Sequence, residues 1–199
     1  LALGFGIALL GYLQGWFGDK SGLQKDTVTI TQGAEKTAEV TTWSSTFSRD
    51  LFLSQVTGDA IYCCGNAFVT TRSAIDYRDG TYFVADEPVS QGDISQLDII
   101  TNHAGLVELA LCYESVTDIA ALSSMTNLTY LDLSGNDIGD VSALTTLPQL
   151  AVLKLSHTGV TDLTPLLSMG SLKQLSVSID MIDSVQNILS GEFDVIVTE

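Results

Sequence analysis

Residues 106–127, LVELALCYESVTDIAALSSMTN, decide the fold because their pattern returns three more times without a gap. The copies are LTYLDLSGNDIGDVSALTTLPQ at 128–149, LAVLKLSHTGVTDLTPLLSMGS at 150–171 and LKQLSVSIDMIDSVQNILSGEF at 172–193. Each copy opens with L-x-x-L-x-L or a close variant, then carries one apolar residue and an apolar pair three residues apart. A fixed period of about 22 residues predicts a solenoid in which each copy forms one coil.

Each coil should begin with a short strand, because the L-x-L alternation points its leucines to one face. The second half of the coil then returns along the outer side. A single coil cannot bury these leucines, whereas stacked coils share one apolar interior. The repeats therefore predict an α/β solenoid with short parallel strands on its concave side. On the convex side we expect 3₁₀ or helical segments such as 142–144 and 164–166, where a proline suits the first turn.

This spacing resembles the leucine-rich repeat, most closely the 22-residue form of bacterial internalin-like surface proteins. The resemblance covers residues 106–193 and is clearest in 128–149. It implies the solenoid fold but says little about the partner, because one scaffold serves many functions. In that family an asparagine after the strand bonds the backbones of neighbouring coils. Here the column reads Glu114, Asn136, Thr158 and Asp180, so we expect looser turns outside the second copy, with local bonding by Thr or Asp.

The chain before the repeats divides into three parts. Residues 1–17, LALGFGIALLGYLQGWF, carry no charge and end in aromatics, as membrane helices do. We interpret them as an uncleaved apolar helix that anchors the protein, with a removed signal segment as the alternative. Residues 18–42 are a polar spacer in which 27–31 alternates like a strand. The repeats are placed outside the cell on the strength of the family resemblance.

Residues 43–105 hold most of the aromatic side chains and predict a small β-rich cap over the first coil. Turn residues suggest one hairpin of 60–64 with 67–71 and another of 75–78 with 81–84. Residues 92–97 resemble the second half of a repeat, and we expect a degenerate first coil that enters the array through 99–102. The repeats run over 106–199, where 194–199 starts a further strand. Because the chain begins with Leu and stops within a strand, we expect a fragment of a longer protein.

Three cysteines allow two interpretations. Cys63 and Cys64 are adjacent, so on a strand one points inward and the other outward. They and Cys112 suit buried small hydrophobic positions, while a disulfide from Cys63 or Cys64 to Cys112 is the alternative in an oxidising exterior. No C-x-x-C spacing for zinc is present.

Catalytic and metal-binding patterns are also missing from the sequence. His157 follows Ser156, but two neighbours do not make a triad. Residues 132–143 imitate a calcium loop without its glycine and its final glutamate. The sequence therefore predicts no enzyme activity, no cofactor and no metal.

The candidate site is the concave face, because side chains that alternate with the strand leucines point outward there. Tyrosines beside polar groups suit protein recognition. The residues that we expect to contact a partner are Glu108, Tyr113, Tyr130, Asp132, Val152, Lys154, His157 and Gln174.

The prediction is a non-enzymatic, membrane-anchored surface protein that binds a protein or glycan through this face. A net charge of −16 opposes nucleic acid and favours cationic partners or simple solubility. Alternatives are a solenoid that only spaces other domains, a secreted form, and a recognition or spacer fragment of a larger enzyme or receptor.

Overall fold

The computed structural model describes residues 26–32, 36–42, 53, 58–94, 97–103, 105–188 and 190–198. The expected apolar helix of residues 1–17 lies outside these residues. Within the described part of the chain, no helix has the length and apolar character that a membrane crossing requires. The division into anchor, spacer, cap and repeats therefore stays a prediction.

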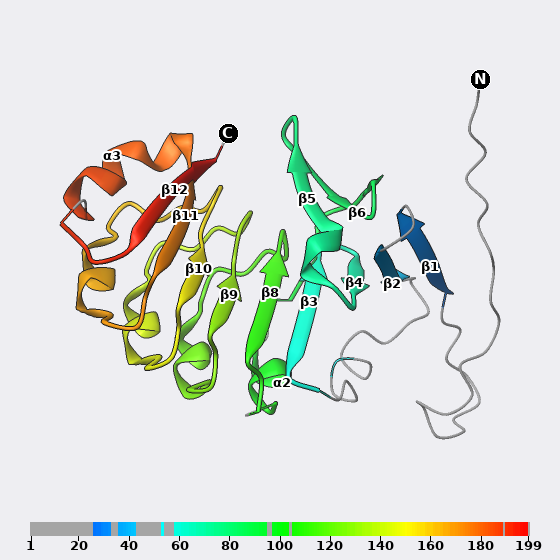
Figure 1. The fold of residues 1–199 in the computed structure, drawn as a ribbon, viewed down its shortest axis with the longest axis horizontal. Coiled ribbons are helices and arrows are strands. Elements are labelled where there is room, and N and C mark those ends of the chain that lie inside the picture. Colours follow the sequence, from blue (N-terminus) through cyan, green and yellow to red (C-terminus); the bar gives the residue numbers. More distant parts are fainter. Residues whose placement is uncertain are drawn as a thin grey trace.

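One large sheet runs through the molecule (Figure 1). Among the described residues it has nine strands. In spatial order they are β1 (Asp26–Gln32), β2 (Lys36–Thr42), β4 (Ala67–Val69), β3 (Ala60–Cys64), β8 (Glu108–Cys112), β9 (Tyr130–Asp132), β10 (Val152–Lys154), β11 (Gln174–Ser178) and β12 (Asp194–Thr198). All pairs from β3 to β12 are parallel. The predicted parallel strands of the repeats are therefore confirmed.

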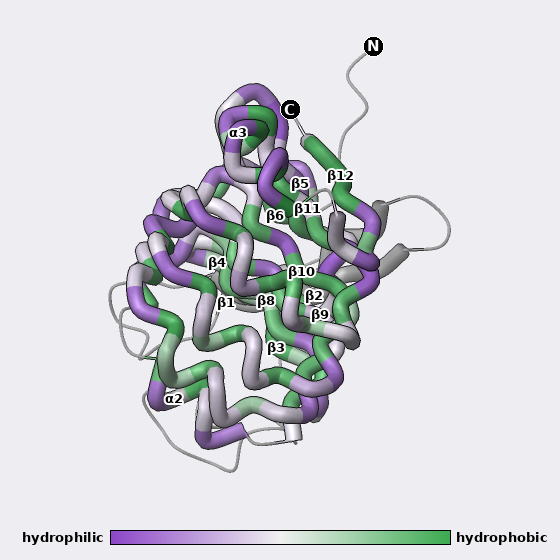
Figure 2. Tube along the Cα trace, turned by 90° about the vertical axis from the view of Figure 1, so that its left-hand side faces the viewer, coloured by the Kyte–Doolittle hydropathy of each residue, from purple (hydrophilic) through white to green (hydrophobic). Residues whose placement is uncertain are grey.

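The register of these strands follows the sequence repeat. Leu131 pairs with Leu109 on one side and with Leu153 on the other. Each is fully buried in the main core, together with the equivalent Leu175. Viewed from the C-terminal end, the coils follow one behind another (Figure 2). Stacking at this spacing gives every strand leucine an apolar neighbour on both sides, which a single coil lacks.

The convex side carries short helices, as the sequence predicted. The first three repeats form the 3₁₀ helices η2 (Ala120–Ser124), η3 (Ser142–Thr146) and η4 (Thr164–Ser168). The fourth forms η5 (Ile179–Met181), α3 (Ile182–Val185) and η6 (Gln186–Ile188).

An aspartate at the same repeat position starts each of the first three helices. Asp118, Asp140 and Asp162 each accept a hydrogen bond from the backbone N–H two residues later. Backbone and hydroxyl bonds from Ser142 lower the pKa of Asp140 from its ordinary value. The side chains thereby satisfy donors that the helix cannot pair within itself.

The first coil of the solenoid begins at β3, and this corrects the sequence interpretation. Residues 60–64 were assigned to a cap, yet Ile61 pairs with Leu109 in parallel register. Ile94, Leu97 and Ile100 are buried in the main core and keep the three-residue spacing of the later coils. The chain enters the next coil through helix α2 (Asp98–Thr101).

The two hairpins predicted within residues 60–84 are confirmed, because β3 pairs with β4 and β5 (Ile75–Arg78) with β6 (Thr81–Val84), both antiparallel. Strand β1 is also confirmed, whereas β2 lies where the sequence predicted only spacer. It pairs with both β1 and β4 and so extends the sheet.

Between β4 and Ile94 the chain makes an excursion that the later coils lack. It contains η1 (Arg72–Ala74), β5, β6 and β7 (Glu87–Pro88), and its three strands form a sheet of their own. We call residues 70–91 the insertion. In Figure 1 it rises beyond the carboxyl end of β3.

Replacing Leu131 by Ala tests the repeat phase. The side chain is fully buried between two coils. Its truncation should lower the free energy of unfolding by about 2–5 kcal/mol in urea denaturation, because it leaves a cavity in a packed interior. Thr126→Ala, at an exposed position, should change it by no more than about 0.5 kcal/mol. Equal effects of the two changes would contradict the phase.

Candidate functional site

The eight residues predicted to contact a partner do lie on one side of the sheet, but they differ in exposure. Tyr130 and Asp132 are only 5% and 6% exposed. The expectation that both face solvent is therefore wrong, and truncating Tyr130 tests stability rather than binding. The half-buried ones are Glu108, Tyr113, Val152, Lys154, His157 and Gln174.

The insertion causes this burial, because it lies over the concave face and builds a second core there. That core is separate from the leucine core on the other face of the sheet. Tyr82 and Val84 come from the insertion and are 6% and 2% exposed. The second core consists of Tyr62, Cys64, Ala67, Val69, Tyr82, Val84, Ala85, Ala110, Cys112 and Tyr130.

Four aromatic rings join the insertion to two of the coils. Tyr82 stacks on Tyr113 with ring centroids 5.3 Å apart and planes inclined by 18°. Tyr77 lies 4.8 Å from Tyr82 and 4.1 Å from the ring of His157. Ring pairs at such distances contribute beyond their buried area. Two of the predicted site residues, Tyr113 and His157, are thus partners of the insertion.

Gly135 makes room for the closest of these rings. A Cβ atom at this position would lie 2.7 Å from Cε2 of Tyr82. Its φ of 74° is also left-handed, and the equivalent Tyr113 and His157 have φ values of 58° and 56°. Non-glycine residues adopt this region at a cost. The turns after β3, β8, β9 and β10 therefore share this conformation. At two of them a Cβ atom would also clash, with the Tyr82 ring at Gly135 and with the Ser90 carbonyl at Gly65.

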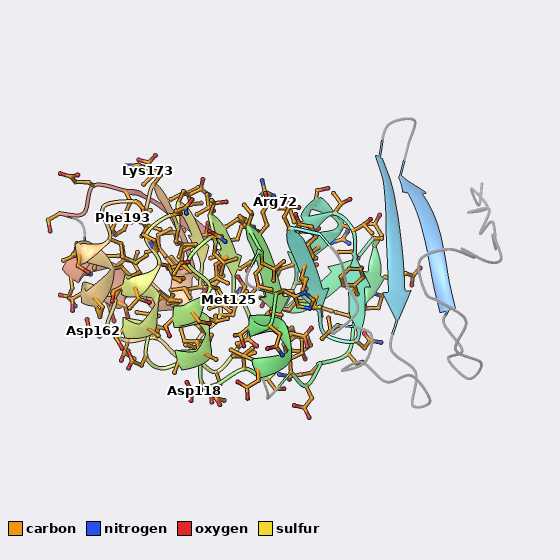
Figure 3. The ribbon with its side chains drawn as sticks, turned by 90° about the horizontal axis from the view of Figure 1, so that it is seen from below. Arg72, Asp118, Met125, Asp162, Lys173 and Phe193 are labelled. Carbon is orange, nitrogen blue, oxygen red and sulfur yellow. The ribbon has the colours of Figure 1, made fainter. Side chains whose placement is uncertain are left out.

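Charged side chains border the second core. Arg72 forms an ion pair of 3.2 Å with Glu108, which also accepts a hydrogen bond of 2.6 Å from the Tyr62 hydroxyl. The guanidinium of Arg72 lies 4.4 Å from the centre of the Tyr130 ring, a cation–π distance. Figure 3 shows Arg72 on the side opposite the convex Asp118.

The buried carboxylate of Asp132 is held by its neighbours. It accepts hydrogen bonds from the hydroxyls of Tyr130 and Ser134 and from the Ser134 N–H, and Lys154 lies 3.5 Å away. Burial raises the pKa of Tyr130 well above its ordinary value, so the phenol stays neutral and donates. These contacts satisfy Asp132 internally rather than presenting it to a partner.

The Tyr82 hydroxyl is an exception to this pairing. It is buried, and within the described part of the chain no hydrogen-bond partner lies near it. Burial also raises the pKa of Tyr82, so the group remains a neutral donor. A buried hydroxyl that makes no bond costs about 1–3 kcal/mol. Nε2 of His157, whose ring lies against Tyr77, is likewise buried without a partner among the described residues, so the insertion packs well but leaves these polar groups unsatisfied.

Asn136 fills the position that the family resemblance marked. Its amide nitrogen donates to the carbonyls of Leu111 and Leu133, and its oxygen accepts from the N–H groups of Glu114 and Val116. It thereby joins two adjacent coils. In the next coil the Thr158 hydroxyl bonds locally to the carbonyl of Leu155 and reaches the following coil through the sulfur of Met181.

The cysteines alternate as predicted, because Cys63 packs in the main core and Cys64 in the second core. Cys64 lies opposite Cys112 in the β3–β8 register, and the three cysteines are buried and form no disulfide with one another. A hydrogen bond with Cys64, together with burial, raises the pKa of the Cys112 thiol. Such thiols are unreactive while they stay covered.

Among the described residues, no three His, Cys, Asp or Glu side chains are placed to hold a metal ion together.

The sequence interpretation missed Tyr82, Tyr77, Arg72 and Gly135. Two features of the sequence were relevant to them: the density of aromatic residues before the repeats, and a glycine in a column whose other members are Tyr113, His157 and Ile179.

The geometry defines the class of protein as a solenoid of parallel coils whose concave face is partly covered. A family model described as Leucine Rich repeat matches residues 124–145. This match agrees with the resemblance that the sequence predicted, and the neighbouring coils keep the same spacing. A comparison with curated proteins finds no match.

Solved structures of similar shape include internalin C2 of Listeria monocytogenes, with 24% identity and a TM-score of 0.43 over 53% of this chain and 57% of that one. A leucine-rich-repeat protein of Leptospira interrogans has 20% identity and a TM-score of 0.45, over 54% and 30%. TLR13 in its complex with ssRNA13 has 27% identity and a TM-score of 0.42, over 55% and 17%. The chain thus spans less than two thirds of each of these structures.

Gly135→Ala should destabilise the protein by at least about 1 kcal/mol in urea denaturation, because the methyl group meets the Tyr82 ring and a left-handed backbone. Two glycines separate these causes. Gly80 has a φ of 76° and open space, whereas Gly139 has open space without that backbone constraint. We expect Gly80→Ala to show the backbone cost alone and Gly139→Ala none. A Gly135→Ala effect no larger than that of Gly80→Ala would contradict the close approach of Tyr82.

Proposed function

We propose that this chain is a non-enzymatic recognition module that binds a protein partner through the part of its concave face that the insertion leaves open. Leucine-rich repeats are a scaffold on which binding surfaces are built, so function depends on the side chains of this face. The observation that supports the proposal is that Val152, Lys154, Gln174 and Ile196 stay at least partly exposed on the sheet whose Tyr130 and Asp132 are buried.

The open part spans β10, β11 and β12. In the strand register Val152 lies beside Gln174, and Lys154 lies beside Ser176 and then Ile196. Val152, Lys154 and Gln174 are half-buried, and Ile196 is 43% exposed. Apolar side chains with polar neighbours suit the centre of a protein interface. Val152, Lys154 and Gln174 are the predicted contact residues that remain in the proposed binding surface.

The charge of the chain supports a protein partner with basic groups. The formal net charge is −16, and residues 106–193 contain only Lys154 and Lys173 as basic side chains. A field of this sign attracts cationic surfaces and opposes the phosphates of nucleic acids.

We further propose that residues 1–17 attach the protein to a membrane and that the repeats face the outside of a cell. The support is the uncharged sequence of this segment and its aromatic end. N-terminal sequencing of the mature chain distinguishes an anchor from a removed leader.

Paired arginine substitutions test the open face. The double change Val152→Arg/Gln174→Arg should lower at least tenfold the amount of surface protein that can be cross-linked to the immobilised chain. The reason is that charge and bulk enter the centre of the proposed binding surface. The matched control, Ser124→Arg/Thr126→Arg, adds the same charge at exposed convex positions.

Capture is measured by quantitative mass spectrometry of proteins retained on the immobilised chain. Thermal unfolding of both variants confirms that they fold. Equal loss in the two variants would point to net charge rather than the face, and no loss in either would overturn the proposed binding surface.

A further inference from the structure

The insertion is connected to the solenoid in two different ways. Its ends are tied by backbone hydrogen bonds, which run from Asn66 N–H to the Ser90 carbonyl at 3.0 Å and from Gly92 N–H to the Tyr113 carbonyl at 2.9 Å. Its strands β5, β6 and β7 instead pair with one another. Side chains thus provide the contacts of its middle with the coils, chiefly through Tyr77, Tyr82 and Val84.

The two cores are also independent in space. The leucine core lies on one face of the sheet and contains the strand leucines of every coil. The second core lies on the other face and depends on the insertion for Tyr82, Val84 and Ala85. Losing the second core would leave the stacking of the coils intact. A unit with its own contacts can open separately from the rest of a protein.

The closed arrangement is imperfect at its centre. The Tyr82 ring is packed over Gly135, yet its hydroxyl is buried without a hydrogen-bond partner in the described part of the chain. Opening would return this hydroxyl to water, which offsets part of the apolar contact that is lost. Tyr82 therefore both holds the insertion in place and limits how firmly it is held.

We propose that residues 70–91 act as a lid that swings as one unit about its tied ends and uncovers the face formed by Tyr62, Cys64, Ala110, Cys112 and Tyr130 while the coils stay folded. The uncovered face carries two tyrosine rings and three small apolar side chains, with the carboxylates of Glu108 and Asp132 bonded to the two tyrosine hydroxyls, so it suits an apolar or aromatic segment of a protein. That use rests on the proposed function, whereas the motion itself does not. The lid would then control how much of the concave face a partner reaches.

The cysteines provide an internal reporter of this motion. Cys64 and Cys112 are fully buried beneath the lid, and Cys63 is fully buried in the leucine core. The full chain is treated with N-ethylmaleimide under native conditions, and each labelled position is followed by tandem mass spectrometry. Each rate is divided by that of the same thiol in the urea-unfolded chain, which removes differences in intrinsic reactivity.

If the lid opens by itself, Cys112 and Cys64 are labelled at least tenfold faster than Cys63. Tyr82→Ala should raise the Cys112 rate at least tenfold and leave the Cys63 rate unchanged. Tyr82→Phe keeps the ring and removes the unsatisfied hydroxyl, so it should slow Cys112. Gly135→Ala should act in the same direction as Tyr82→Ala, and Gly139→Ala should have no effect.

Equal rates for Cys112 and Cys63 in the wild type, rising together in Tyr82→Ala, would overturn the lid because the molecule would then open only as a whole. Should Tyr82→Ala prevent folding, the Tyr82→Phe comparison decides: a Cys112 rate that is unchanged or faster would also overturn the proposal. Because no partner takes part, these results are independent of whether the open concave face binds a protein.

Discussion

The structure depends on apolar side chains that are buried only because the next coil covers them. Leu109, Leu131 and Leu153 are paired across adjacent strands and are fully buried. Each coil supplies half of the environment that its neighbour needs, so the coils stabilise one another. The same requirement explains the first coil, where Ile61 pairs with Leu109 although a long insertion separates it from the second half of its repeat.

The stacking leaves the opposite face of the sheet to be used in two ways. Over β3, β8 and β9 the insertion closes it with Tyr82, Val84 and the ring contacts of Tyr77. Over β10 to β12 the side chains of Val152, Gln174 and Ile196 stay at least partly exposed. One sheet therefore carries two cores at its N-terminal part and one core with an open face at its C-terminal part. Recognition, as we propose it, belongs to the open part.

The sequence predicted the coils well because their signal is periodic. Strand positions, convex 3₁₀ helices and the alternation of Cys63 and Cys64 all follow from local spacing. The strand of the first coil was misassigned, since Ile61 and Cys63 replace leucines and the insertion breaks the period before Ile94. Periodicity also indicates which face a side chain points to but not what covers that face.

The candidate site shows this limit most clearly. Tyr130 and Asp132 were correctly placed on the concave side, yet their burial depends on an insertion that is distant in sequence. Gly135 was informative in hindsight, because its neighbours in the column, Tyr113 and His157, adopt the same left-handed backbone with side chains. The extra need for space came from Tyr82, which no local pattern could reveal.

The most direct test of this arrangement is a nuclear Overhauser measurement between the Tyr82 ring protons and the α protons of Gly135 in the folded chain. The closed insertion predicts a strong cross-peak, with α protons shifted upfield by the ring that lies over them. Gly139, which has open space around it, should show neither effect. A Tyr82 ring with the chemical shifts of an unstructured peptide and no cross-peak to Gly135 would contradict the account.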